Sequence, residues 1–102
     1  MPNVSNPPSK KVASGVVCAN PCIFHGYLVG TDGVNDVTVT LFDNASAASG
    51  EEIVPTATYD ASAGGINGAT GMNVRCVNGI YLELSVAGAG AAEVVVQYAP
   101  LR

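Results

Sequence analysis

Asp36-Val-Thr-Val-Thr-Leu-Phe-Asp43 is the stretch of sequence that decides the fold. Val37, Val39 and Leu41 share one face of this stretch if it is extended, and the two threonines share the other. A period of two is typical of a β-strand with one buried face, whereas a helix would repeat every 3.6 residues. The stretch therefore predicts a half-buried strand.

The same alternation recurs toward the C-terminus. Residues 72–77 and 80–86 alternate apolar and polar side chains, and Asn78-Gly79 lies between them. Asn-Gly readily takes positive φ at both central positions of a type I′ turn, so we predict a hairpin over residues 72–86. Residues 92–98 alternate again, which predicts a third strand and hence a meander.

The front half of the chain shows shorter and less regular strand signals. Residues 12–18 and 22–29 predict two strands, and residues 51–59 predict a third that is bent at Pro55 and therefore lies at a sheet edge. Four glycines in residues 61–71 predict a flexible loop if nothing packs on this segment. About seven short strands in 102 residues indicate an all-β fold, a small antiparallel β-sandwich.

The apolar phases of the clearest strands also predict the hydrophobic core. We expect it to contain Val37, Val39, Leu41, Val74, Leu82, Leu84, Val94 and Val96.

Composition limits what such a domain can do. The chain has 102 residues, enough for one domain, and 48% hydrophobic residues exclude a disordered chain. Charged residues make up 12%, against about 25% in an ordinary soluble protein, and packing against other subunits is one explanation for such a surface. A net charge of −4 argues against binding to nucleic acid, so we predict no nucleic-acid partner. No apolar run is long enough to span a membrane, so we predict no membrane partner.

The first eleven residues differ from the rest. They hold three prolines and the only adjacent positive charges, a composition that favours extended chain over helix. We predict that residues 1–11 form an extended arm that docks on a partner, and that residues 12–102 form the sandwich domain. The predicted partner-binding residues of the arm are Pro2, Asn3, Val4, Pro7, Pro8, Lys10 and Lys11.

Catalytic patterns are weak. His25 is the only histidine and lies in a predicted strand, where a structural role is far commoner than a catalytic one. Asp32-Gly-Val-Asn-Asp36 lacks the alternating ligands and distal glutamate of a calcium loop, so we interpret it as a turn. We expect no enzyme activity, no catalytic residues and no cofactor.

The cysteines allow two further interpretations. Cys18, Cys22, His25 and Cys76 are one possible zinc set, but the alternation places Cys76 on an apolar face, and we predict no metal. An odd number of cysteines fits reduced thiols. If one pair oxidises after release from the cell, we expect it to be Cys18 with Cys22.

Several of these segments together form a recognisable pattern. They are Gly15-Val-Val-Cys18, His25-Gly-Tyr-Leu-Val-Gly30, Val37 to Gly50, Val77 to Val86, and Val94-Val-Val-Gln-Tyr98. Over roughly residues 15–98 the chain resembles small β-sandwich virion proteins of tailed bacteriophages, a loose group that includes capsid decoration (cement) proteins and tail or neck components. The resemblance implies a structural role and no catalytic residues, and the three cysteines lie outside its pattern.

What the resemblance implies is a capsid decoration protein on the outer surface of the virion, made in the host bacterial cytoplasm. Its partners would be the major capsid protein or other virion proteins, and a homo-oligomer is expected, with a trimer favoured. The first alternative is a tail, neck or receptor-binding component. The second is a free-standing glycan-binding β-domain, in which Tyr27, Tyr59 and Tyr81 would supply an aromatic face.

Overall fold

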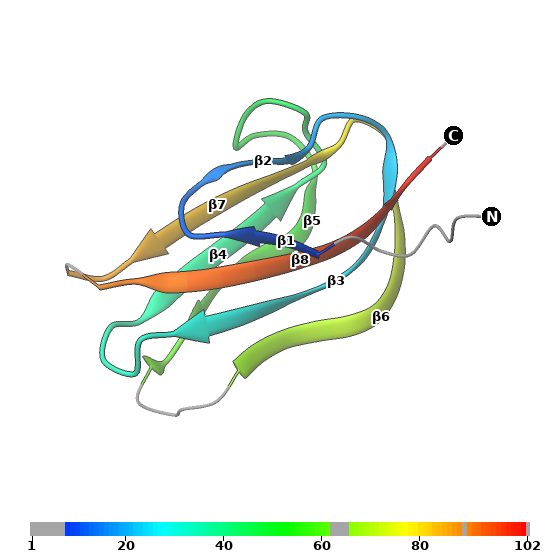
Figure 1. Ribbon diagram of the computed structural model, residues 1–102. Helices are drawn as coiled ribbons and strands as arrows, with labels where there is room; N and C mark the ends of the chain where they lie inside the picture. Colours follow the sequence, from blue (N-terminus) through cyan, green and yellow to red (C-terminus); the bar gives the residue numbers. More distant parts are fainter. Residues whose placement is uncertain (1–7, 62–65, 89, 102) are drawn as a thin grey trace.

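Every regular element in the described part of the chain is a β-strand, which confirms the all-β prediction (Figure 1). The computed structural model describes residues 8–61, 66–88 and 90–101. The strands are β1 (Pro8–Lys11), β2 (Gly15–Cys18), β3 (Cys22–Thr31), β4 (Val37–Phe42), β5 (Glu52–Tyr59), β6 (Ile66–Cys76), β7 (Ile80–Val86) and β8 (Ala92–Pro100).

Two four-stranded antiparallel sheets pack face to face as a sandwich (Figure 1). One sheet has the order β1-β8-β3-β6 and the other β2-β7-β4-β5. Of the described strands, only β4 and β5 follow each other within one sheet; every other connection crosses to the opposite sheet. Because almost every turn of the chain changes sheet, strand neighbours come from distant parts of the sequence.

The predicted 72–86 hairpin and the meander after it are wrong. β6 lies in one sheet and β7 in the other, and β8 pairs with β1 and β3. The Asn78-Gly79 segment crosses between the sheets, and its backbone N–H groups are held by the carboxylate of Asp43 instead of by a type I′ turn. A long-range carboxylate therefore takes the hydrogen bonds that local turn chemistry would have made.

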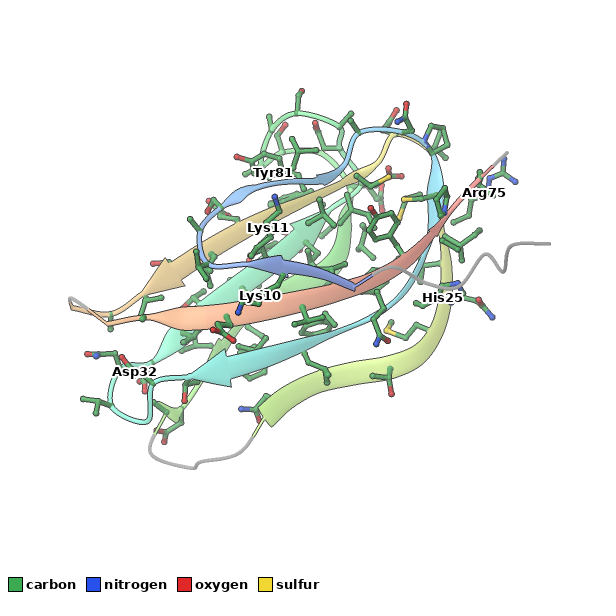
Figure 2. The ribbon with its side chains drawn as sticks, viewed as in Figure 1. Lys10, Lys11, His25, Asp32, Arg75 and Tyr81 are labelled. Atoms are coloured by element: carbon green, nitrogen blue, oxygen red, sulfur yellow. The ribbon has the colours of Figure 1, made fainter. Side chains whose placement is uncertain are left out.

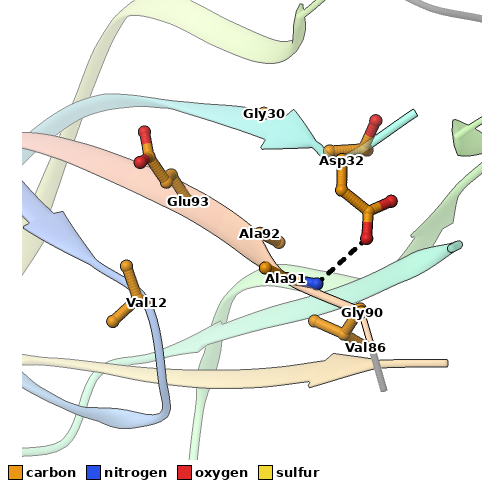
Figure 3. Close-up of a pocket in the computed structure, with 9 residues that line it drawn as sticks. Val12, Gly30, Asp32, Val86, Gly90, Ala91, Ala92 and Glu93 are labelled. Atoms are coloured by element: carbon orange, nitrogen blue, oxygen red, sulfur yellow. Dashed lines mark hydrogen bonds between the residues drawn. The ribbon is translucent and has the colours of Figure 1, made fainter. Parts of the chain in front are cut away.

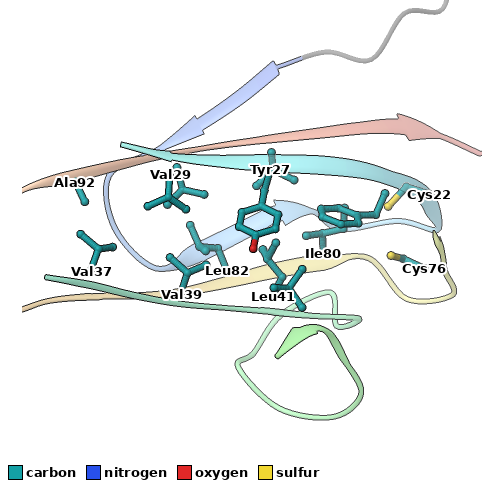
Figure 4. Close-up of a cluster of buried hydrophobic side chains, with 14 residues drawn as sticks. Cys22, Tyr27, Val29, Val37, Val39, Leu41, Cys76, Ile80, Leu82 and Ala92 are labelled. Atoms are coloured by element: carbon teal, nitrogen blue, oxygen red, sulfur yellow. The ribbon is translucent and has the colours of Figure 1, made fainter. Parts of the chain in front are cut away.

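The core fills the space between the sheets (Figure 4). Six of the eight predicted core residues are fully buried, and the remaining two, Val74 and Leu84, are partly buried and pack against the cluster. Along β7 the burial follows the predicted phase, with Leu82 buried and Glu83 exposed. The buried core residues are Cys22, Phe24, Tyr27, Val29, Val37, Val39, Leu41, Val54, Cys76, Ile80, Leu82, Ala92, Val94 and Val96.

A bulge in β3 shifts its inward phase. Phe24 pairs with Tyr98 of β8 and Gly26 with Gln97, so His25 is an extra residue, and the buried side chains change from even to odd positions after it. Opposite the bulge, the predicted 61–71 loop is wrong in its second half, because residues 66–71 belong to β6. Those residues lack an alternating apolar pattern because they form an edge strand that is largely exposed.

The predicted boundary between arm and sandwich also needs correction. Residues 8–11 are not part of a free arm: they form β1, which pairs with residues 94–97 of β8 at the edge of the sheet. Lysines and a proline suit an edge strand, since one side of it bonds to no neighbour. Pro2, Asn3, Val4 and Pro7 lie outside the described residues.

Candidate functional site

An open cleft of about 530 Å³ lies at one end of the sandwich (Figure 3). The ends of β3 and β7, the start of β8 and the β1–β2 turn form its walls. Small side chains dominate these walls, and two carboxylates belong to them. The lining residues are Val12, Gly30, Thr31, Asp32, Val86, Gly90, Ala91, Ala92 and Glu93.

Both carboxylates of the cleft are engaged in contacts within the protein. Asp32 accepts backbone N–H groups of Val34 and Asn35 at 2.8 Å and of Ala91 at 3.0 Å. The Asn35 side-chain amide, which also donates to Asp32, is the largest of the causes that hold the Asp32 pKa well below its usual range. Glu93 forms an exposed ion pair with Lys10 (Nζ to Oε2, 3.3 Å). The cleft is thus built around structural hydrogen bonds.

The Asp32–Asp36 segment is the turn that the sequence predicts. Its first carboxylate closes the turn on itself and ties it to the start of β8, whereas Asp36 accepts a hydrogen bond from the N–H of Ala61. Asp32 and Asp36 therefore bind different parts of the chain and do not face a common site. Among the residues that the structure describes, no group of three or more histidine, cysteine, aspartate or glutamate side chains is arranged to hold a metal ion.

His25 serves the bulge between β3 and β6 (Figure 2). Its Nδ1 lies 3.0 Å from the carbonyl oxygen of Met72, a distance at which a protonated Nδ1 donates. Met72 falls between Thr70 and Val74, which pair with the β3 residues on either side of His25. The ring thus bonds a carbonyl of β6 at the point where the β3–β6 register shifts.

The tyrosines do not form a shared aromatic surface. Tyr27 is buried in the core, and its hydroxyl meets that of Tyr59 at 2.5 Å, joining β3 to β5 across the two sheets. Tyr81 lies on β7, half-buried on the outer phase of that strand (Figure 2). The face on which the glycan-binding alternative depends is therefore not assembled from these three residues.

The strand edges differ in how well they are protected against pairing with another chain. β1 has four residues and carries Lys10 and Lys11, and β2 has four residues and an irregular register. β5 contains Pro55 and two register shifts. Short length, lysine, proline and bulges are the features that natural proteins use to block an edge.

β6 forms the fourth edge and has fewer of these features. It runs for 11 residues, contains no proline, and Arg75 is its only charged residue. Gly68, Ala69 and Thr70 are exposed and lie in the regular stretch before the bulge. In an antiparallel edge strand, half of the backbone N–H and C=O groups point away from the sheet, so this stretch offers a template for another strand. Sequence reasoning missed this edge because its glycines resembled a loop.

In the part of the chain that the structure describes, no helix has the length and apolar character needed to cross a membrane. Comparison with protein-family models, with curated proteins and with solved structures finds no match to this chain.

Proposed function

We propose that this chain is a structural virion protein, a capsid decoration protein of a tailed bacteriophage that binds the major capsid protein shell and stabilises it. The observation that carries the proposal is the β6 edge, which is long, nearly uncharged and paired on one side only. The low content of charged residues, 12%, supports burial of further surface by partner subunits. The strand pattern over residues 15–98 supports the virion assignment.

The proposed mechanism is binding by strand addition. A strand of a neighbouring subunit bonds to the free backbone groups of β6, which gives affinity without a dedicated pocket. Copies of the chain associate, as a trimer, and each copy bridges adjacent capsid subunits. Repeated contacts of this kind reinforce a shell through avidity, so each single contact needs only modest affinity.

Electron microscopy of intact particles of the virus that encodes the chain tests the location. Density for the sandwich over the outer capsid surface is expected. Density confined to the tail or neck would favour the tail, neck or receptor-binding alternative, and a particle without this protein would overturn both assignments. Light scattering on the purified protein measures the number of copies in the oligomer.

A matched pair of variants tests the edge. Thr70→Lys adds a charge to the exposed face of β6, and Ser85→Lys adds the same charge to an exposed site on β7, a central strand. We expect both variants to fold with wild-type circular dichroism, and only Thr70→Lys to lose occupancy on capsids. Equal occupancy of the two variants would contradict binding through β6.

A further inference from the structure

Three free thiols gather at one end of the sandwich. Cys18 ends β2, Cys22 begins β3 and Cys76 ends β6, so residues from both sheets meet there. Cys22 and Cys76 are completely buried and lie close to each other (Figure 4). Cys18 is half-buried and packs against the same cluster, so it is the thiol that solvent reaches most easily.

The register of the sheet places two of these residues as direct partners. Cys22 of β3 lies opposite Cys76 of β6 in the antiparallel ladder. Directly opposed residues have Cα atoms about 4.5–5.5 Å apart, which falls within the ~4.4–6.8 Å range of disulfides. A bond between these two sulfurs therefore needs no rearrangement of the strands.

The electrostatics of the three thiols give them different reactivities. The hydrogen bond to Cys76 raises the pKa of Cys22, with burial and the neighbouring Cys18 acting in the same direction. The same hydrogen bond lowers the pKa of Cys76. Since the thiolate is the attacking species in disulfide exchange, Cys76 is the better nucleophile of the buried pair and Cys22 is the sulfur that it attacks.

We propose that the three cysteines form a thiol–disulfide relay that takes oxidation from the half-buried Cys18 to a final disulfide between Cys22 and Cys76. The oxidant is a small disulfide such as oxidised glutathione. The final pair differs from Cys18–Cys22, the pair that the sequence favours, because those two residues belong to strands of different sheets and Cys22 has a direct ladder partner.

The relay consists of three exchange steps. The Cys18 thiolate attacks the small disulfide, which forms a mixed disulfide and releases one glutathione thiolate. Cys22, the buried thiol that contacts Cys18, then attacks the Cys18 sulfur in spite of its raised pKa and expels the second glutathione. Finally Cys76 attacks the Cys22 sulfur and releases Cys18. Each attacking thiol gives its proton to solvent and each leaving thiolate takes one up, so two protein thiols are oxidised and one small disulfide is reduced to two thiols.

The Cys22–Cys76 disulfide would link the edge strand β6 covalently to its neighbour. A Cys22–Cys76 bond joins β6 to β3 just beyond the bulge, and it closes a loop that contains β3 to β6. Closing a long loop reduces the conformational entropy of the unfolded chain. The oxidised protein is therefore expected to melt several degrees higher than the reduced protein.

Non-reducing tryptic digestion identifies the pair. Arg75 is the only lysine or arginine between Cys18 and Cys76, so trypsin separates Cys76 from the other two cysteines. After folded protein has been treated with oxidised glutathione, we expect peptides 12–75 and 76–102 to stay joined until a reductant is added. A bond within peptide 12–75, or no disulfide at all, would overturn the proposal.

Single variants test the relay order. In Cys22→Ser, the mixed disulfide between Cys18 and glutathione should accumulate and no internal disulfide should form. In Cys76→Ser, the Cys18–Cys22 disulfide should be the final product. Cys18→Ser should still form the final pair, but about tenfold more slowly, because the entry thiol is missing. Joined peptides in Cys22→Ser, or an unchanged rate in Cys18→Ser, would contradict the relay. Circular dichroism before oxidation checks that each variant is folded.

Discussion

Asp43 shows how one side chain can replace a turn. Its carboxylate accepts the N–H groups of Val77 at 3.0 Å, Asn78 at 2.8 Å and Gly79 at 3.2 Å. The end of β4 thereby holds the chain as it crosses from β6 to β7. In the sequence, Asp43 is recognisable only as the aspartate that follows a strand and precedes a small-residue loop. This local pattern does not predict that the carboxylate binds the distant 77–79 segment.

We expect Asp43→Ala to lower the free energy of unfolding by about 1–3 kcal/mol, because it removes the acceptor of three N–H groups. Glu83→Ala removes an exposed carboxylate from β7 and is the control of equal charge. Urea denaturation measures both. A loss no larger than that of the control would show that water replaces the carboxylate without cost.

The Tyr27–Tyr59 contact should make stability depend on pH in the alkaline range. Burial is the first cause, and the hydrogen bond to Tyr27 the second, that raise the Tyr59 pKa. A raised folded-state pKa stabilises the folded protein fully below the unfolded pKa, about 10, and this stability is lost as pH rises toward the folded value. The free energy of unfolding of Tyr59→Phe should therefore lie furthest below that of the wild type at pH values under 10. The difference between the two proteins should shrink as the pH rises above 10.

Denaturation curves at several pH values measure this convergence. Tyr27→Phe removes the same hydrogen bond, so the double variant should lose less than the sum of the two single variants. Additive losses, or a gap that widens with pH, would mean that the hydroxyl pair does not act as a unit.

At the scale of a strand, the alternation of apolar residues predicts β7 and β8 well because these strands lie inside a sheet with one face toward the core. In β4 it places Val37, Val39 and Leu41 correctly, but the strand is not half-buried as predicted, because Thr40 and Phe42 are buried as well. The alternation fails for β3 after His25, where the bulge shifts the phase, and for the first half of β6, which has little to bury. The alternation of apolar residues reflects burial of one strand face. It is therefore absent from an exposed edge strand, and it predicts the wrong inward residues where a bulge interrupts the ladder.

Two leucines of β7 provide a graded test of burial. Leu82 is fully buried and Leu84 only partly, although they share one face of the strand. We expect Leu82→Ala to cost about 2–5 kcal/mol of unfolding free energy, and Leu84→Ala less, since a partly exposed site leaves a smaller cavity. Thermal or urea unfolding ranks the pair, and equal losses would show that Leu84 is buried in solution.

Gly68 tests the close approach of β6 to β3. It has φ +144°, and an added Cβ would collide with the carbonyl oxygen of Tyr27 and lie 2.9 Å from Leu28 Cα. Gly68→Ala should destabilise the domain by more than about 1 kcal/mol, because backbone atoms cannot yield as a flexible side chain does. Gly15→Ala, where a Cβ meets nothing within 4 Å, is the control. Equal melting temperatures would contradict the close approach.

For the whole molecule, composition and strand signals predict the sandwich, whereas the pairing order depends on contacts between residues far apart. The boundary at residue 12 illustrates this limit, because a proline- and lysine-rich segment looks the same as a free arm or as an edge strand. Only the partner strand, β8, distinguishes the two. The ladder partner of Cys22 could not be predicted for the same reason, because the spacing of the three cysteines in the sequence says nothing of the strand pairing that places Cys22 opposite Cys76.

Two truncations isolate the contribution of β1. We expect the chain lacking residues 1–11 to be about 1–3 kcal/mol less stable than the chain lacking residues 1–7, because it loses several backbone hydrogen bonds worth ~0.5–1.5 kcal/mol each. It should also aggregate more readily, since the edge of β8 becomes free. Identical denaturation curves for the two truncations would show that β1 adds nothing to the sheet.

The place of β8 has a consequence for how the protein is made. β8 is the last of the described strands, yet it lies inside its sheet, between β1 and β3. During synthesis the first strand to emerge must wait for the last before it has a neighbour. Folding that relies on such distant pairings is slow, in the millisecond to second range. Until β8 has been made, the sheet that contains β1 and β3 stays incomplete, and its unpaired strand edges are surfaces that chaperones can bind in that interval.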